Sequence, residues 1–294
     1  MSKIIDLHMH THISSDGDFS PEELLRQVNE SGLKIIAIAD HNSARAIEPA
    51  LPFAQKYGIQ LIPAIELDAL YHGRILHILG YNINPKDEAL LANDLAVRKL
   101  ELENSTVLMD KVAALDIHFD REAVLAISAE GIVVAEMIAE IALADPRNDN
   151  HPLLEPLRPG GARSDNPYVN FYWDICSQGK PAFVPMTYIS LEEAITLITE
   201  AGGVPVFAHP GNNIGQDREM AIDIMSYGLK GIEAYSSYHN QETTQFYLQL
   251  AKELDVFVTV GSDYHGKNKP AITLGGVEVE DEAALIETFL AAIN

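Results

Sequence analysis

The chain has 294 residues, of which 47% are hydrophobic, and this composition excludes an intrinsically disordered protein. The length suits one barrel-sized domain, or one domain that carries a smaller inserted one. The formal net charge of −23 repels polyanions, so general nucleic-acid binding is not expected. An anionic substrate would need a local positive site, which bound metal ions can supply.

The start of the chain, "MSKIIDLHMH", has no signal-peptide pattern, and no apolar run reaches the length of a membrane span. Cys176 is the one cysteine, so an internal disulfide is excluded. We therefore predict a cytoplasmic protein with no membrane partner. A homo-oligomer is compatible with the sequence.

Short apolar runs alternate with amphipathic segments along most of the chain. The clearest helix signal is "SPEELLRQVNESG", with Ser20 as N-cap, Glu23 at the capping-box position and Gly32 after the end. Further helices are predicted over 44–57, 191–203, 216–228, 240–254 and from 281. Strands are predicted over 3–8, 34–40, 59–67, 74–82, 204–209, 231–235 and 256–263, with a short β segment over 274–279.

Seven or so strands interleaved with helices predict an α/β fold with a parallel sheet. A barrel is favoured over an open sheet, because no Gly-rich nucleotide loop follows the first strand. Residues 83–190 break the alternation of strands and helices. They begin with a helical sequence pattern and continue with a Pro-, Gly- and Asn-rich stretch. We predict a discontinuous barrel, residues 1–82 and 191–294, with a mainly helical insertion (cap) domain over 83–190.

The stretch "DLHMHTH" places three histidines within five positions at the end of the first predicted strand. Side chains alternate between the faces of a strand, so His8 and His10 point the same way. Two imidazoles on one face are poor core residues and good metal ligands.

Other ligand-type residues also lie where predicted strands end, and in a barrel these ends gather at one face. Together they predict a polynuclear metal site. Its nine candidate ligands are His8, His10, Asp16, His41, Glu66, His77, His209, Asp263 and His265.

The motifs "DLHMH…SDG…SPEEL", "IADHN", "IELDA", "HILGY", "FAHP" and "GSDYHG" resemble, in order, those of the polymerase and histidinol phosphatase (PHP) superfamily. This resemblance implies a distorted seven-stranded (β/α) barrel with two to three divalent metal ions. The helical insertion after "HILGY" is similar to that of stand-alone phosphoesterases that act on nucleotides and short oligonucleotides.

The resemblance also implies roles for single residues. His8, His10, Glu66 and Asp263 would hold one ion, and Glu66 would bridge to a second ion on His77 and His209. Asp16, His41 and His265 would hold the third. Asp6 and Asp40 resemble residues that orient the ligating imidazoles. Asp263, Glu66 and His239 are expected to act in catalysis.

Substrate contacts are the least defined part of the resemblance. Insertions of this type often carry a Gly-Arg-Pro-His run. The corresponding segment here is "EGIVVAEMIAEIAL", which has no Arg and no His. Arg158, Arg163 and Lys180 are the basic candidates in the insertion, and His239 is a further candidate for contact with the substrate phosphate.

These features predict an enzyme, a metal-dependent phosphoric ester hydrolase. It would cleave a phosphomonoester, of a nucleotide or a similar small phosphorylated metabolite, by in-line attack of metal-bound hydroxide. The mixed N/O ligand set suits Mn, Fe or Zn better than Mg. The main alternative is a 5′-3′ exonuclease on short RNA or DNA oligonucleotides. An amidohydrolase would require a bridging lysine at a strand end, and a non-catalytic metal-binding module is expected to have lost ligands.

Overall fold

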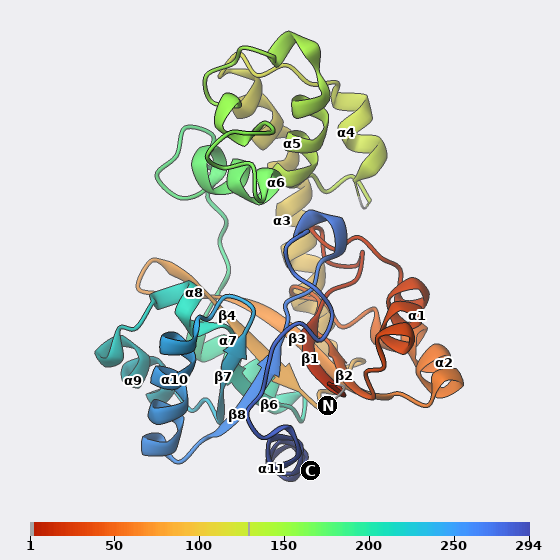
Figure 1. The fold of residues 1–294 in the computed structure, drawn as a ribbon, viewed down its shortest axis with the longest axis vertical. Helices are drawn as coiled ribbons and strands as arrows, with labels where there is room; N and C mark the ends of the chain where they lie inside the picture. Colours follow the sequence, from red (N-terminus) through yellow and green to blue (C-terminus); the bar gives the residue numbers. More distant parts are fainter. Residues whose placement is uncertain (1–2, 129) are drawn as a thin grey trace.

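The computed structural model describes residues 3–128 and 130–294. A sheet with surrounding helices forms one body, and a helical lobe lies above it (Figure 1). The long helix α3 (Glu88–Ala113) runs from the first body into the second. Within the described residues, no helix has both the length and the apolar character needed to cross a membrane.

Seven strands follow one another around a nearly closed, barrel-shaped sheet, which confirms the predicted fold class. Between the end strands β1 and β8, the N–H of His10 donates to Tyr264 O (2.9 Å) and that of Asp263 to His8 O (2.8 Å). A short eighth strand, β5 (Ile189–Ser190), pairs with β3. The seven strands in sheet order are β1 (Ile5–Met9), β2 (Ile35–Ile38), β3 (Gln60–Tyr71), β4 (Arg74–Tyr81), β6 (Val204–Phe207), β7 (Gly231–Ser236) and β8 (Phe257–Gly261).

Strand β4 is the exception to a parallel sheet, because it runs antiparallel to both β3 and β6. A tight turn at His72 and Gly73, both with positive φ, joins β3 to β4. The predicted parallel sheet is therefore interrupted at this strand, where the hairpin in "YHGR" reverses the chain. The hairpin sets His77 directly opposite Asp68.

Helices cover the outside of the barrel, and their ends follow the predicted signals. In α1 (Pro21–Ser31), Ser20 and Glu23 form the predicted capping box, and Gly32 ends the helix with φ of +87°. The remaining barrel helices are α2 (Ile47–Tyr57), α7 (Leu191–Glu200), α8 (Pro210–Ile214), α9 (Arg218–Ser226), α10 (Gln241–Leu254) and α11 (Glu282–Ile293).

The predicted β segment over 274–279 is not a strand. Gly275 has φ of +61°, and its N–H donates to the Asp6 carboxylate (2.9 Å). This turn satisfies a buried carboxylate, which outweighs the weak β pattern of the segment.

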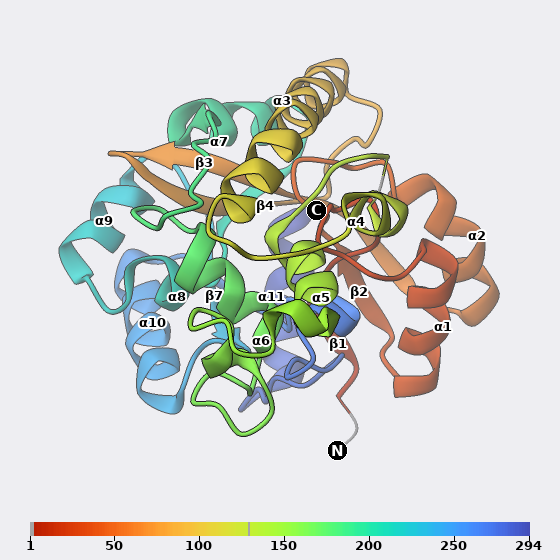
Figure 2. The ribbon, with the colours of Figure 1, turned by 90° about the horizontal axis from the view of Figure 1, so that it is seen from above.

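The lobe above the barrel has its own apolar core, which includes Val112, Ile138 and Phe171. Its helices lie over the barrel when the molecule is seen from above (Figure 2). An ion pair between Lys267 Nζ and Glu140 Oε2 (3.4 Å) joins a barrel loop to the lobe. Besides α3, the lobe contains α4 (Arg121–Ile127), α5 (Ala135–Ala144), α6 (Pro167–Phe171) and short helical turns at Pro146–Asn148, Glu155–Leu157 and Tyr172–Cys176.

Candidate metal centre

The nine side chains predicted as ligands lie together on the side of the barrel that faces the lobe. Glu66, in the middle of the long strand β3, is fully buried at their centre. Five imidazole nitrogens lie within 3.3 Å of its carboxylate: those of His8, His10 and His41 face Oε2, and those of His77 and His209 face Oε1.

Two aspartates complete the cluster. Asp263 Oδ1 lies 2.9 Å from His10 Nε2 and 3.2 Å from His8 Nε2. Asp16 Oδ2 lies 3.0 Å from His265 Nε2, so the loop after β1 brings this carboxylate to the site.

Two of the nine residues have left-handed backbone conformations, which are unfavourable for residues other than glycine. Asp263 has φ of +58° and His209 has φ of +24°. Such strain costs on the order of 1–3 kcal/mol and persists where the surrounding structure imposes it. At both positions the strand has just ended, and the unusual φ directs the side chain into the cluster.

The donor atoms of this cluster fit divalent metal ions. Six buried atoms make no hydrogen bond to any described residue, namely His8 Nε2, Asp16 Oδ1, His41 Nδ1, Glu66 Oε2, His209 Nδ1 and His265 Nε2. A buried polar atom without a partner is costly, and metal ions shared by these side chains would satisfy most of these atoms. Imidazole and carboxylate donors are typical ligands of Mn, Fe and Zn.

Three groups of side chains have donor atoms close enough to share an ion. The group of His8, His10, Glu66 and Asp263 is the one that the sequence predicted for the first metal. The other two differ in part from the predicted sets, because His10 joins Asp16, His41 and His265, and His41 joins Glu66 and His77. His209 still lies 3.0 Å from Glu66 Oε1.

The charges of the cluster shift the pKa values of its members in opposite directions. Burial alone raises the pKa of Glu66, but the surrounding imidazoles outweigh it and hold the pKa well below its usual range. Burial likewise lowers the pKa of His77, but Glu66 and Asp68 outweigh it and raise the value to about 10. For His10, burial and the neighbouring His265 lower the pKa to about 4. The carboxylates are thus held ionised, as ligands to a cation must be.

The carboxylates of Asp6 and Asp40, predicted to orient the ligating imidazoles, bind backbone groups next to them and not the rings themselves. Asp6 accepts from the N–H groups of His8 and Ser262, at 3.3 and 2.9 Å. Asp40 accepts from the N–H of Thr11 (2.6 Å) and from its hydroxyl (2.7 Å). Both carboxylates therefore fix the loops that carry the ligands, because backbone N–H groups buried beside them require acceptors.

Two residues that the sequence analysis missed hold the imidazoles directly. Glu233 Oε1 accepts from His8 Nδ1 (3.0 Å), and its Oε2 accepts from the N–H of His209 (2.8 Å). Ser14 Oγ lies 3.0 Å from His10 Nδ1. Glu233 interrupts the apolar run "GIEAY" in β7, and a charged residue at such a position was the signal that could have revealed it.

Asp68, Tyr238 and Lys269 form a further set of missed residues around the cluster. Asp68 Oδ1 lies 3.1 Å from His77 Nε2. The Tyr238 hydroxyl and Lys269 Nζ (2.7 Å) both donate to Asp263 Oδ2. Asp68 could have been found from the strand period, since it lies two residues after Glu66 and so on the same face of β3.

His239, which was predicted to act in catalysis, has both ring nitrogens bonded to backbone groups in this structure. Its Nδ1 donates to Ala234 O (2.8 Å), and its Nε2 accepts from the N–H of Gly211 (2.9 Å). Burial lowers its pKa, so the ring stays neutral and can accept this bond. Its role here is to tie the end of β7 to the turn that follows His209.

Arg158, Arg163 and Lys180, the predicted substrate contacts, do not line the cavity beside the cluster. Arg158 and Arg163 pair within the lobe, with Asp149 at 3.4 Å and Asp174 at 3.0 Å. Lys180 is exposed on the surface. None of the three lines the cavity that adjoins the cluster, because local carboxylates or solvent hold them away.

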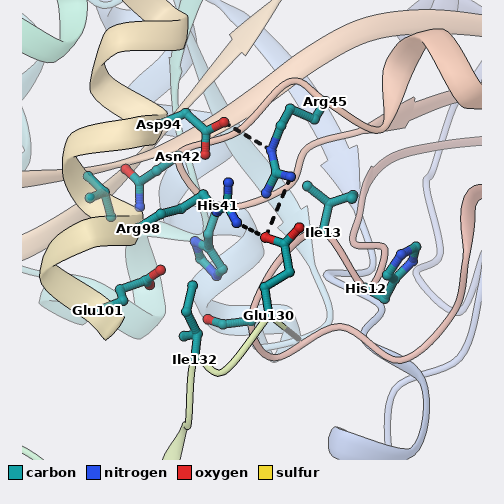
Figure 3. A pocket seen from close by; sticks show the side chains of 12 residues that line it. His12, Ile13, His41, Asn42, Arg45, Asp94, Arg98, Glu101, Glu130 and Ile132 are labelled. Carbon is teal, nitrogen blue, oxygen red and sulfur yellow. Dashed lines mark ion pairs between the residues drawn. The ribbon is translucent and has the colours of Figure 1, made fainter. Parts of the chain in front are cut away.

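The cavity beside the cluster has a volume of about 190 Å³ and brings two other arginines near the site (Figure 3). His41 belongs both to the cluster and to the cavity wall. Arg45 enters from the loop after β2, and Arg98 enters from α3. Any substrate held at the cluster would therefore extend between the barrel and the lobe.

Comparison with known proteins agrees with this geometry. The PHP domain model matches residues 6–140. The chain is 30% identical to a 5′-3′ exoribonuclease of Haemophilus influenzae, over 90% of this chain and 91% of that protein. It is 26% identical to a 3′,5′-nucleoside bisphosphate phosphatase of Chromobacterium violaceum, over 93% and 91%. A structure from Bifidobacterium adolescentis, described as a metal-dependent phosphoesterase, superposes with a TM-score of 0.80 at 25% identity, over 99% and 97%.

The fold and the buried cluster define the class of protein, a metal-dependent phosphoesterase. The chain belongs to the PHP family, as its motifs had indicated.

Proposed function

We propose that the protein hydrolyses a phosphomonoester of a nucleotide or a similar small phosphorylated metabolite, with two to three Mn, Fe or Zn ions held by the nine clustered side chains. The observation that carries the proposal is the carboxylate of Glu66, buried among five imidazoles. When bound, such ions would polarise the phosphate and activate a water for in-line displacement.

The residues of the chain would position and shield this chemistry. Glu233 fixes the ring of His8 so that its Nε2 points at Glu66. Lys269 places a positive charge 2.7 Å from Asp263, at the edge of the cluster. Ser14 lies beside the cluster, but its hydroxyl is bonded to His10 Nδ1 and to the N–H of His41, so water is the expected nucleophile and no phosphoenzyme is expected.

We further propose that residues 83–190 form a domain that caps the site. Its apolar core lies apart from that of the barrel, and all nine candidate ligands lie outside it. Glu136, on α5, has its pKa raised to about 7 by burial and by the charge of Asp16, which supports a water-poor space between lobe and cluster. A cap of this kind excludes bulk water and supplies contacts remote from the reacting phosphate.

The test is turnover of p-nitrophenyl phosphate by protein reconstituted with Mn, Fe or Zn. Hydrolysis that is lost with a chelator and restored by metal supports the proposal, whereas no turnover with any of the three metals contradicts it. Bis-p-nitrophenyl phosphate serves as the matched diester, and a monoesterase hydrolyses it far more slowly.

A 5′-3′ exoribonuclease is the second candidate, because a relative that matches most of the chain carries that name. Rates on oligonucleotides of two to ten residues separate the two. An exonuclease releases nucleotides from every length, whereas a phosphatase removes terminal phosphate only.

A further inference from the structure

The cavity next to the cluster differs from a phosphate-binding pocket in its charges. Its wall contains two arginines and three carboxylates, those of Asp94, Glu101 and Glu130. Arg45 Nε lies 3.0 Å from Asp94 Oδ2, and Arg98 pairs with Glu130. Figure 3 shows both arginines turned toward these carboxylates. Each positive charge in the wall is thus matched by a negative one.

Glu101 is the third carboxylate, and no described residue forms an ion pair with it. Burial, with the charges of Asp68 and Asp16, raises its pKa to about 8. With its proton the wall has no net charge, and without it the wall has a net charge of −1. In neither case does the cavity hold the surplus of positive charge that a second phosphate requires.

The wall is nevertheless rich in hydrogen-bonding groups. The paired guanidinium and carboxylate groups place donors beside acceptors, and Glu101 has no ion-pair partner among the described residues. Such a wall matches hydroxyl groups, each of which can donate and accept. The cavity of about 190 Å³ is also smaller than the 300 Å³ or more that is common for drug-sized ligands.

We infer that this cavity holds the uncharged, polyhydroxylated leaving group of a sugar-sized monophosphate and does not hold a second phosphate. The inference rests on the proposed function, because it assumes that the reacting phosphate lies at the cluster. It separates this chain from the relative named as a bisphosphate phosphatase.

Two matched pairs of substrates test the inference in metal-loaded protein. Adenosine 3′-monophosphate and adenosine 3′,5′-bisphosphate differ by one phosphate, and we expect the bisphosphate to have a kcat/KM about tenfold lower. Ribose 5-phosphate and n-pentyl phosphate differ in their hydroxyls, and we expect the sugar phosphate to be about tenfold better. A bisphosphate that is tenfold better than the monophosphate would overturn the inference.

Variants of the carboxylates that pair with the two arginines test whether this pairing is what disfavours a second phosphate. Asp94→Asn removes the nearer of the two carboxylates that pair with Arg45, and Glu130→Gln releases Arg98 from a carboxylate that is 60% exposed and so safe for folding. Each should raise the relative rate on the bisphosphate about tenfold and lower it on ribose 5-phosphate. Glu103→Gln is the control, since Glu103 is exposed on α3 outside the cavity and pairs only with Lys99 at 4.0 Å. Unchanged ratios in both variants would contradict the assignment.

Calorimetric titration separates this inference from the proposed function. If no ester is hydrolysed, the phosphatase proposal fails, but the relative affinities of the same four compounds still decide what the cavity prefers. Tighter binding of the monophosphate and of ribose 5-phosphate supports the inference. Tighter binding of the bisphosphate refutes it, whatever the activity.

Discussion

Glu66 belongs to two of the three candidate ion groups, so a single change there should affect more than one ion. Glu66→Gln removes the charge and keeps the shape. We expect turnover of p-nitrophenyl phosphate to fall by about 100-fold or more and the bound metal to fall by at least one ion. Kinetics and elemental analysis measure the two effects. Near wild-type turnover would contradict a bridging role.

Glu233 provides a second test at this scale, because it holds two ligand-bearing residues without facing the ions. In Glu233→Gln the bonds to His8 Nδ1 and to the N–H of His209 weaken. We expect metal affinity to fall about 10- to 100-fold, a range typical of such supporting residues. Competition with a chromophoric chelator measures the affinity. Glu193→Gln, in an exposed capping box on the outer helix α7, is the control and should leave affinity unchanged.

At the scale of residues, the candidate metal ligands were easier to predict from the sequence than the residues that form hydrogen bonds to them. The nine candidates could be found because ligand-type side chains followed strands one after another. Glu233 could not be found in the same way, because it becomes a neighbour of His8 only in the folded chain, across 225 positions. His239 shows the reverse, since its ring is bonded to backbone groups that only the structure reveals.

Among the strands, β8 passes so close to β1 that only glycine fits at its last position. A Cβ at Gly261 would lie 2.2 Å from both His8 Cβ and Glu233 Oε1. Gly261→Ala should therefore displace the first ligand, reduce metal binding by about tenfold or more, and destabilise the fold by about 1–3 kcal/mol.

Gly231→Ala is the matched control for that change. Gly231 begins β7, and a Cβ there would meet the Phe257 ring at 2.8 Å. We expect a similar loss of stability, measured by urea unfolding, with metal content unchanged. If both variants lost metal equally, the effect would come from general destabilisation and the specific contact at Gly261 would be refuted.

The elements themselves were largely predictable where local signals were strong, as at the capping box of α1. The direction of β4 follows from the tight hairpin at His72 and Gly73, since the apolar run of the strand does not itself encode a direction. The antiparallel direction of β4 matters for the site, since it places His77 directly opposite Asp68 on the neighbouring strand.

For the whole molecule, we expect two or three metal ions per chain and a metal-dependent stability that varies with pH. In protein stripped by a chelator, the raised pKa of His77, about 10, means that protonation of its ring stabilises the fold. This contribution is complete below the unfolded pKa of about 6.5 and disappears as the pH rises toward 10. An ion must displace that proton, so the increase in Tm on adding Mn should grow from pH 6 to pH 8.

Differential scanning calorimetry at pH 6, 7 and 8, with and without Mn, measures this trend. A rise in Tm that is the same at all three values would show that ligand protonation does not compete with the metal. Elemental analysis with one ion or none after reconstitution would count against the polynuclear centre.

The hydrogen bonds between β1 and β8 have a consequence for how the protein matures on the ribosome. His8 and Asp263 come from opposite ends of the chain, 255 positions apart, yet lie 3.2 Å from each other. The first ion site is complete only after β8 has been synthesised and has closed against β1, which is a contact of very high sequence separation. We therefore expect tight metal uptake to be deferred until translation of the barrel is nearly finished, and a nascent chain that stalls before β8 to lack the complete first group of ligands.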